Sequence, residues 1–256
     1  MTAALIICRR EIAAALASPV AYVLFGAFAF IYGYFFTEFL RNFVEVGMRM
    51  SELGGFSGGS LHVNHDLINP LLLTAAVVLL FLVPLISMRS LAAEVRSGTM
   101  ELLLTAPISD GQIVAGKFLG GFALYLTMLA VSLLHVAVLF WFGQPDILPI
   151  LAGYLGLALF GAATIALGLF FSSLTSSQIV AGVLTLAALL LLWVVEFAGQ
   201  TGGSFGRLLA YVSVTGHLAE PARGVVAVRD VIYYLSFAGF FLLLTRETVR
   251  SRRWRG

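Results

Sequence analysis

Six long apolar segments, nearly free of charged residues, recur along the chain. They cover residues 19–37, 70–88, 118–142, 150–171, 179–196 and 228–245. A helix that crosses a bilayer needs about 20 mainly apolar residues. The last segment is the least regular, because Arg229 and Asp230 interrupt its beginning. The pattern predicts an all-α polytopic membrane protein with six transmembrane helices, forming a single domain over residues 1–256.

Residues 1–18 have a different pattern, in which apolar and charged positions alternate with helical spacing. The apolar positions are Leu5, Ile12 and Leu16, and the charged ones are Arg9, Arg10 and Glu11. This pattern predicts an amphipathic elbow helix on the membrane surface, with the charged residues toward water. Ser18-Pro19 separates it from the first span. The apolar stretch that follows is too long for the core of a signal peptide, so we expect the segment to be retained.

The composition of the whole chain indicates that most of its surface contacts lipid. Hydrophobic residues make up 60% and charged residues 11% of the chain, against about 45–50% and about 25% in soluble proteins. A soluble or disordered chain is thereby excluded. The single cysteine, Cys8, excludes an intrachain disulfide. A net charge of +2 is too small to indicate nucleic acid as a partner.

The distribution of Lys and Arg predicts the orientation. If the amino terminus is inside, ten of the 15 basic residues lie in inner segments and five in outer ones. Because basic residues favour the cytoplasmic side, we expect an inner-membrane protein with both termini in the cytoplasm. The arginine cluster over residues 250–255 is either part of this topology signal or a contact with the anionic leaflet.

Polar segments between the spans provide the remaining signals. Residues 38–69 and 198–229 are predicted outer loops. The first begins with Glu38, Arg41, Glu45 and Arg49 at helical pair spacing, and the second is predicted to hold short interfacial or re-entrant helices. The inner loop over residues 89–117 has an amphipathic helical pattern that is interrupted at Gly98-Thr99 and ended by Pro107. Such a helix either lies on lipid headgroups or docks on a cytosolic partner.

This inner loop resembles a known family. The pattern is Glu94-x3-Gly98-Thr99-x-Glu101-Leu102-Leu103-Leu104-Thr105-x-Pro107-Ile108-Ser109. It is similar to the loop between spans two and three of ABC-2 type transporter permeases, and closest to the gliding-motility-associated permease subunits. Further similar patterns lie at Arg10–Tyr22, Ser172–Ile179 and Arg223–Tyr234. Together they extend over nearly the whole chain.

The resemblance implies a type V exporter-like half-transporter. Such permeases pair with a second permease subunit, identical or related, and bind a separate cytosolic ATPase that holds ATP and magnesium. The implied function is to couple ATP hydrolysis to export or mechanical work, and a periplasmic component is compatible with it. The inner loop would carry the coupling helix, with Glu94, Arg96, Gly98, Thr99, Glu101 and Leu102 at the ATPase interface. No catalytic, cofactor-binding or metal-binding residue is expected in this chain itself.

Rival functions have weaker support. Gly111-x4-Gly116-Lys117 matches the start of a phosphate-binding loop, but Phe118 replaces the hydroxyl residue that would bind magnesium. Lys117 is instead expected to anchor the span at the inner interface. The spans lack the motifs of an intramembrane hydrolase or metalloprotease. A secondary transporter should carry buried acidic residues or broken helices in matching halves, and the spans here have almost no internal charge. A membrane anchor that recruits an ATPase without transport stays open.

Two histidine-containing positions have alternative interpretations. His62, His65 and Asp66 either bind a metal at the outer surface or are solvated loop residues. His135 lies inside the third span, either as a functional group or as a neutral histidine bonded to a neighbouring hydroxyl.

Ala158, Ala162 and Ala166 recur at every fourth position and indicate close helix packing, within a subunit or between two. The sequence leaves the substrate open among a lipid, a peptide and haem.

Overall fold

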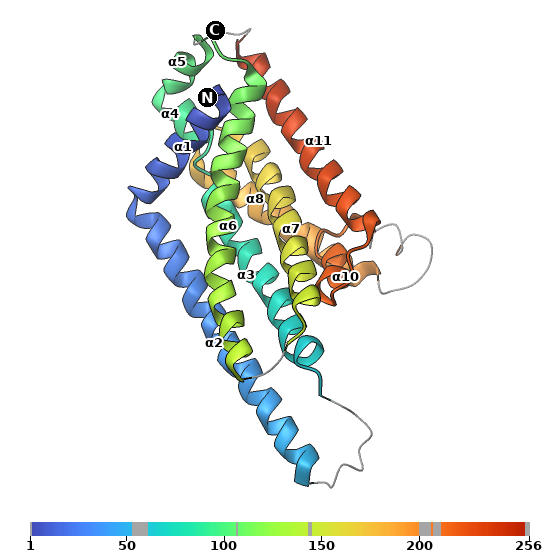
Figure 1. The fold of residues 1–256 in the computed structure, drawn as a ribbon. Helices are drawn as coiled ribbons and strands as arrows, with labels where there is room; N and C mark the ends of the chain where they lie inside the picture. The colour runs from blue at the N-terminus through green and yellow to red at the C-terminus, as the bar shows by residue number, and fades with distance from the viewer. Residues whose placement is uncertain are drawn as a thin grey trace.

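A computed structural model describes residues 2–52, 61–105, 107–142, 145–199, 206 and 211–253. All regular structure within these residues is helical. Six of the helices are long and apolar enough to cross a membrane. They are α2 (Pro19–Glu52), α3 (Asn69–Ser87), α6 (Asp110–Phe142), α7 (Ile147–Leu174), α8 (Gln178–Gly199) and α11 (Val228–Arg253) (Figure 1). The predicted all-α, six-span fold class is confirmed.

Shorter helices occupy the ends of this bundle. They are α1 (Ala3–Leu16), the π-helical turn η1 (Val63–Ile68), α4 (Ala92–Ser97), α5 (Thr99–Thr105), the 3-10 turn η2 (Gly216–Leu218) and α10 (Ala219–Ala222). Figure 1 shows α4, α5, the beginning of α1 and the end of α11 at one end of the bundle, whereas the end of α2 reaches the opposite one. The short helices expected within residues 198–229 are thus present. Residues 53–60, 200–205 and 207–210, also part of the predicted outer loops, lie outside the described residues.

Helix α2 begins at the predicted break and continues beyond the apolar segment. Its first residue is Pro19, whose fixed φ suits the first turn of a helix. Its 34 residues make it roughly 50 Å long, more than the ~30 Å hydrocarbon core of a bilayer. The additional turns carry ion pairs between Arg41 and Glu38 at 3.4 Å and between Arg49 and Glu45 at 3.7 Å. The predicted helical pair spacing is therefore confirmed, and the helix extends well past residue 37.

Helix α7 is the centre of the bundle, in contact with α3, α6, α8, α10 and α11. Close approach depends on glycine: a Cβ at Gly161 would overlap the ring of Tyr125 on α6. The hydroxyl of Tyr125 donates a hydrogen bond to the carbonyl oxygen of Leu157 at 2.7 Å. Ala166 is fully buried inside the chain. At least this member of the small-residue stripe packs within the subunit.

Helix α1 packs along the first half of α6. The contact is close because Gly116 and Gly120 present no side chain: a Cβ at Gly116 would lie 2.7 Å from the carbonyl oxygen of Ala4, and one at Gly120 would lie 2.6 Å from Cβ of Glu11. Leu5 and Leu16 are exposed, as an amphipathic helix on a membrane surface requires. Glu11 does not face water as expected, because the side of α1 that carries it is turned toward α6.

Replacing Gly120 with alanine should loosen α1 from α6. The added methyl group would overlap the stem of Glu11, and overpacking of this kind costs about 1–3 kcal/mol. We expect severalfold faster maleimide labelling of Cys8, the only cysteine, which is partly buried on α1. The matched control is Gly111→Ala on the same helix, where a Cβ meets nothing within 4 Å. Equal labelling rates in both variants would contradict the proposed close packing.

Candidate functional site

A buried lysine on α6 joins three separate parts of the chain. The side chain of Lys117 is 1% exposed. Its ammonium group donates to Oε1 of Glu11 at 2.9 Å and to the carbonyl oxygen of Ser90 at 2.6 Å, and it lies 2.9 Å from Oε2 of Glu94. The contact with Glu94 is an ion pair, because Oε2 of Glu94 accepts no hydrogen bond within the described part of the chain. Lys117 is not an exposed anchor that reaches outward to the headgroups: its ammonium group points inward, where the carboxylates of Glu11 and Glu94 pair with it.

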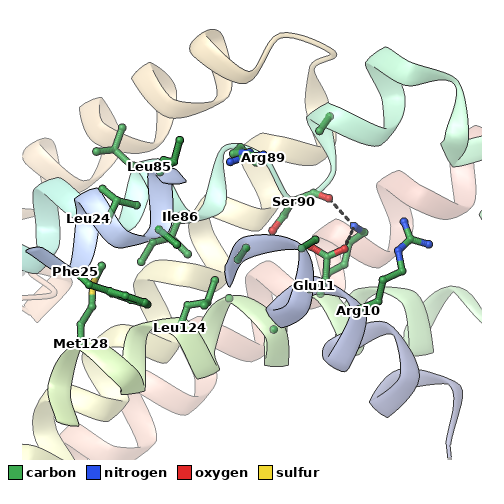
Figure 2. A pocket seen from close by; sticks show the side chains of 18 of the residues that line it. Arg10, Glu11, Leu24, Phe25, Leu85, Ile86, Arg89, Ser90, Leu124 and Met128 are labelled. Carbon is green, nitrogen blue, oxygen red and sulfur yellow. Dashed lines mark hydrogen bonds and ion pairs between the residues drawn. The ribbon is translucent and has the colours of Figure 1, made fainter. Parts of the chain in front are cut away.

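Glu94 bridges this lysine to the elbow helix. Its Oε1 accepts a hydrogen bond from Nη2 of Arg10 at 3.2 Å, and its side chain is only 10% exposed. Figure 2 shows Arg10 and Glu11 of α1 at the same end of the site as Ser90, and its dashed line is the hydrogen bond from Lys117 to the carbonyl oxygen of Ser90. We name Arg10, Glu11, Glu94 and Lys117 the elbow cluster. It links α1, α4 and α6, which are far apart in the sequence.

The inner loop that carries Glu94 folds into two short helices. Helix α4 ends at Ser97, and Gly98 follows with φ 72°, in the left-handed region that favours glycine. Helix α5 begins at the next residue, Thr99. The hydroxyl groups of Ser97 and Thr99 are hydrogen-bonded at 2.8 Å across this bend. The predicted interruption at Gly98-Thr99 is confirmed.

A serine from the end of α7 holds the beginning of this loop. The backbone N–H groups of Leu91 and Ala92 both donate to Oγ of Ser172 at 3.0 Å, and Ser172 donates to the carbonyl oxygen of Met88 at 3.0 Å. All these groups would otherwise be orphaned at the helix ends. Sequence reasoning noted Ser172 only as part of a family pattern. It did not identify the contact, because the two segments lie about 80 residues apart.

The apolar face of the loop is partly covered by the chain's own helices. Leu91 and Met100 are buried against Val114, Leu169 and Val249, which belong to α6, α7 and α11. Neither interpretation offered by the sequence, a helix on headgroups or a helix in a partner's groove, included this internal packing. The face that remains outward carries polar groups.

The structure separates the six predicted interface residues into groups. Arg96, Gly98 and Glu101 are exposed and Thr99 is partly exposed. Glu94 faces the elbow cluster instead of the surface. The side chain of Leu102 lies outside the described residues. The outward face of α4 and α5 thus offers charges of both signs, with Arg96 on α4 and Glu101 on α5, on either side of Gly98.

The segment that matches the start of a phosphate-binding loop is helical. Gly111, Gly116 and Lys117 all lie inside α6, which begins at Asp110. Gly116 contacts α1 and Lys117 is occupied by the elbow cluster. A phosphate-binding loop instead needs a strand, a glycine-rich turn and free backbone N–H groups before its helix.

The histidines have structural contacts. Asp66 accepts the backbone N–H of His62 at 2.9 Å, and Oδ1 of Asp66 lies 3.0 Å from Nδ1 of His65. Among the described residues no group of three His, Cys, Asp or Glu side chains could hold a metal ion. His135 contacts the rings of Tyr32 and Phe36 edge-on. Its Nδ1 has no hydrogen-bond partner within the described part of the chain, so the expected bond to a hydroxyl is not formed by that nitrogen.

A second buried polar centre lies at the beginning of α11 and was missed by sequence reasoning. Nδ1 of His217 lies 2.7 Å from Oδ1 of Asp230, and Nε2 lies 3.0 Å from the carbonyl oxygen of Tyr211. A carbonyl oxygen can only accept, so Nε2 must carry a proton. Oδ1 of Asp230 also accepts a hydrogen bond from Nε of Arg229 at 3.3 Å. The pair of His217 and Asp230 fastens the segment before α11 to the bundle.

Comparison with known proteins fits this architecture. A family model described as ABC-2 family transporter protein matches residues 5–252. The chain belongs to the ABC-2 transporter family. It is therefore a multi-pass membrane subunit of an ABC-2 transporter, and membership implies an ATPase partner. The match does not distinguish the gliding-motility branch from other ABC-2 branches. The comparison with curated proteins found no match.

Removing the lysine should strongly destabilise this ABC-2 subunit. In Lys117→Met, the carboxylates of Glu11 and Glu94 lose their shared cation, and breaking a buried ion pair costs about 3–5 kcal/mol. We expect a loss of that order in the free energy of unfolding, measured by denaturation in mixed detergent micelles. Arg10→Gln is the control: Arg10 is 62% exposed, and an exposed pair contributes about 1 kcal/mol or less. Similar losses in both variants would rule out a special role for the buried lysine.

Proposed function

We propose that this chain is the permease subunit of an ABC transporter in which α4 and α5 form the coupling element for a separate cytosolic ATPase. The observation that supports this most is the attachment of α4. The elbow cluster ties it to α1 and α6, and Ser172 ties its beginning to α7. An element fastened at both sides moves its neighbours when it is moved.

The outward face of α4 and α5 is the proposed ATPase contact. Arg96, Gly98 and Glu101 are exposed there, and both charge signs are available for complementary pairing with a partner. Glu94 contributes indirectly, by holding α4 in place through Lys117. Thr99 and Leu102 complete the proposed contact from the family resemblance.

The proposed mechanism is rigid-body movement. The partner ATPase, which holds ATP and magnesium, closes as a dimer and displaces the coupling element. Because α4 is tied to α1, α6 and α7, the displacement would tilt these helices together, as in hinge and shear transitions of packed helices. Export or mechanical work across the inner membrane would follow. A second permease subunit, identical or related, would supply the other half of the pathway, and the gliding-motility resemblance adds a periplasmic component as a further proposal.

Charge reversal on the outward face should weaken ATPase binding. In Arg96→Glu and Glu101→Lys, attractive pairs with the ATPase become repulsive, which we expect to reduce its recovery in pull-downs from membranes by roughly tenfold. The control is Arg41→Glu, an exposed arginine in the second half of α2, the helix whose end lies opposite α4 and α5 (Figure 1). Insertion should be equal in all three variants. Undiminished ATPase recovery with both α4–α5 variants would refute the coupling assignment.

The proposed orientation can be tested by labelling. In a Cys8→Ser background, a cysteine replacing Arg49 at the end of α2 should react with a membrane-impermeant maleimide in intact cells. A cysteine replacing Arg96 should react only after permeabilisation, because the positive-inside rule places α4 in the cytoplasm. If the cysteine at position 96 reacts in intact cells, the cytoplasmic coupling element is excluded.

A further inference from the structure

The elbow helix leaves a cavity beneath it. The cavity has a volume of about 220 Å³ and lies between α1, the beginning of α2, the end of α3 and α6 (Figure 2). Figure 2 shows that its two ends differ. One end is lined by apolar side chains, among them Leu24, Phe25, Ile86, Leu124 and Met128. The other end is lined by the elbow cluster together with Arg89 and Ser90.

The polar end carries one positive charge that is not neutralised. Its charged residues are three cations, Arg10, Arg89 and Lys117, and two carboxylates, Glu11 and Glu94. Within the elbow cluster the carboxylates pair with Lys117 and Arg10. The guanidinium of Arg89 donates to Oγ of Ser18 at 3.3 Å and forms no ion pair with any described residue. This end therefore favours an anionic group.

The position of the cavity limits the kind of molecule that fits. Arg89 follows the last residue of α3 by two positions, so it lies where a span leaves the hydrocarbon and meets the headgroups. Whole small molecules usually occupy pockets of about 300–1,000 Å³, which is more than this cavity offers. It is therefore suited to part of a larger amphiphile whose remainder stays in the bilayer. Leu24 and Leu124 would contact an acyl chain, and Arg89 a phosphate.

We propose that this cavity binds one anionic phospholipid from the surrounding leaflet. The phosphate would accept hydrogen bonds from the guanidinium of Arg89, whose planar fork suits two phosphate oxygens. One acyl chain would lie along Leu24, Phe25 and Leu124. Basic pockets between transmembrane helices bind anionic headgroups for the same physical reason. The lipid would act as a wedge between α1 and the spans, and this role does not depend on the proposed ATPase.

The test is native mass spectrometry on the full-length protein, delipidated in detergent and titrated with phosphatidylglycerol. We expect one tightly bound phosphatidylglycerol per chain. Arg89→Gln should bind it about tenfold more weakly, since a hydrogen bond to a charged group is worth at least one factor of ten. Ala14→Trp, which fills the rim of the cavity, should bind equally poorly. Arg89→Lys, which keeps the charge, should retain most of the binding.

Two matched controls share the elbow helix. Arg9→Gln removes a charge and Ala13→Trp adds an indole, and both positions are exposed without lining the cavity. Both controls should bind phosphatidylglycerol like the unmodified chain. Equal weakening by Arg9→Gln and Arg89→Gln would overturn the proposal in favour of general surface attraction.

Further ligands distinguish the source of the phosphate. Phosphatidylcholine should bind at least tenfold more weakly than phosphatidylglycerol, because it carries no net charge. Millimolar inorganic phosphate should leave the bound phosphatidylglycerol in place, because it lacks the acyl chain. Equal binding of both lipids, or displacement of the lipid by phosphate, would overturn the proposal.

Discussion

The arrangement of the helices at the α4–α5 end of the bundle depends on one buried ammonium group. Lys117 lies 2.9 Å from a carboxylate oxygen of Glu11 on α1 and from one of Glu94 on α4. Withdrawing one carboxylate would leave the lysine with a single ion pair, and withdrawing both would leave a buried charge without compensation, which costs several kcal/mol. Replacing buried pairs with apolar residues is often neutral or stabilising, so the cluster need not add net stability. Its physical effect is to favour one relative position of α1, α4 and α6 over all others.

This constraint bears on the proposed transfer of motion. Helix α4 is held by the elbow cluster on one side and by Ser172 of α7 at its beginning. Leu91 and Met100 add apolar contacts to α6, α7 and α11. A force on the exposed face of α4 and α5 would therefore act on several spans together. Gly98, with its left-handed φ, is the one position between α4 and α5 where the backbone departs from helical geometry.

The sequence predicted features that depend on local pattern and missed those that depend on distant contacts. Span number follows from length and apolarity, and the bend at Gly98 follows from glycine. Glu94 was assigned to the ATPase interface because its position matches the family pattern of the inner loop, and a pattern of this kind does not distinguish an exposed carboxylate from a buried one. Its partner Lys117 belongs to another helix, and that contact has no local signature. Gly116 and Gly120 beside a single lysine at the beginning of a span are the one signal that could have indicated a buried, tightly packed charge.

The placement of charge also bears on the choice between mechanisms. The elbow cluster lies at the end of the bundle that carries α4. The pair of His217 and Asp230 lies at the beginning of α11. Between these ends, residues 118–142 and 150–171 contain no Asp, Glu, Lys or Arg. The polar contacts there are neutral, such as the 2.9 Å bond between Ser132 and Tyr154. An ion-coupled transporter is expected to carry ionisable groups along its path, and in these two segments the ionisable side chains are His135 and the tyrosines. Here the charges join neighbouring elements at the ends of the bundle, an arrangement that suits helices displaced as rigid bodies by an external source of energy.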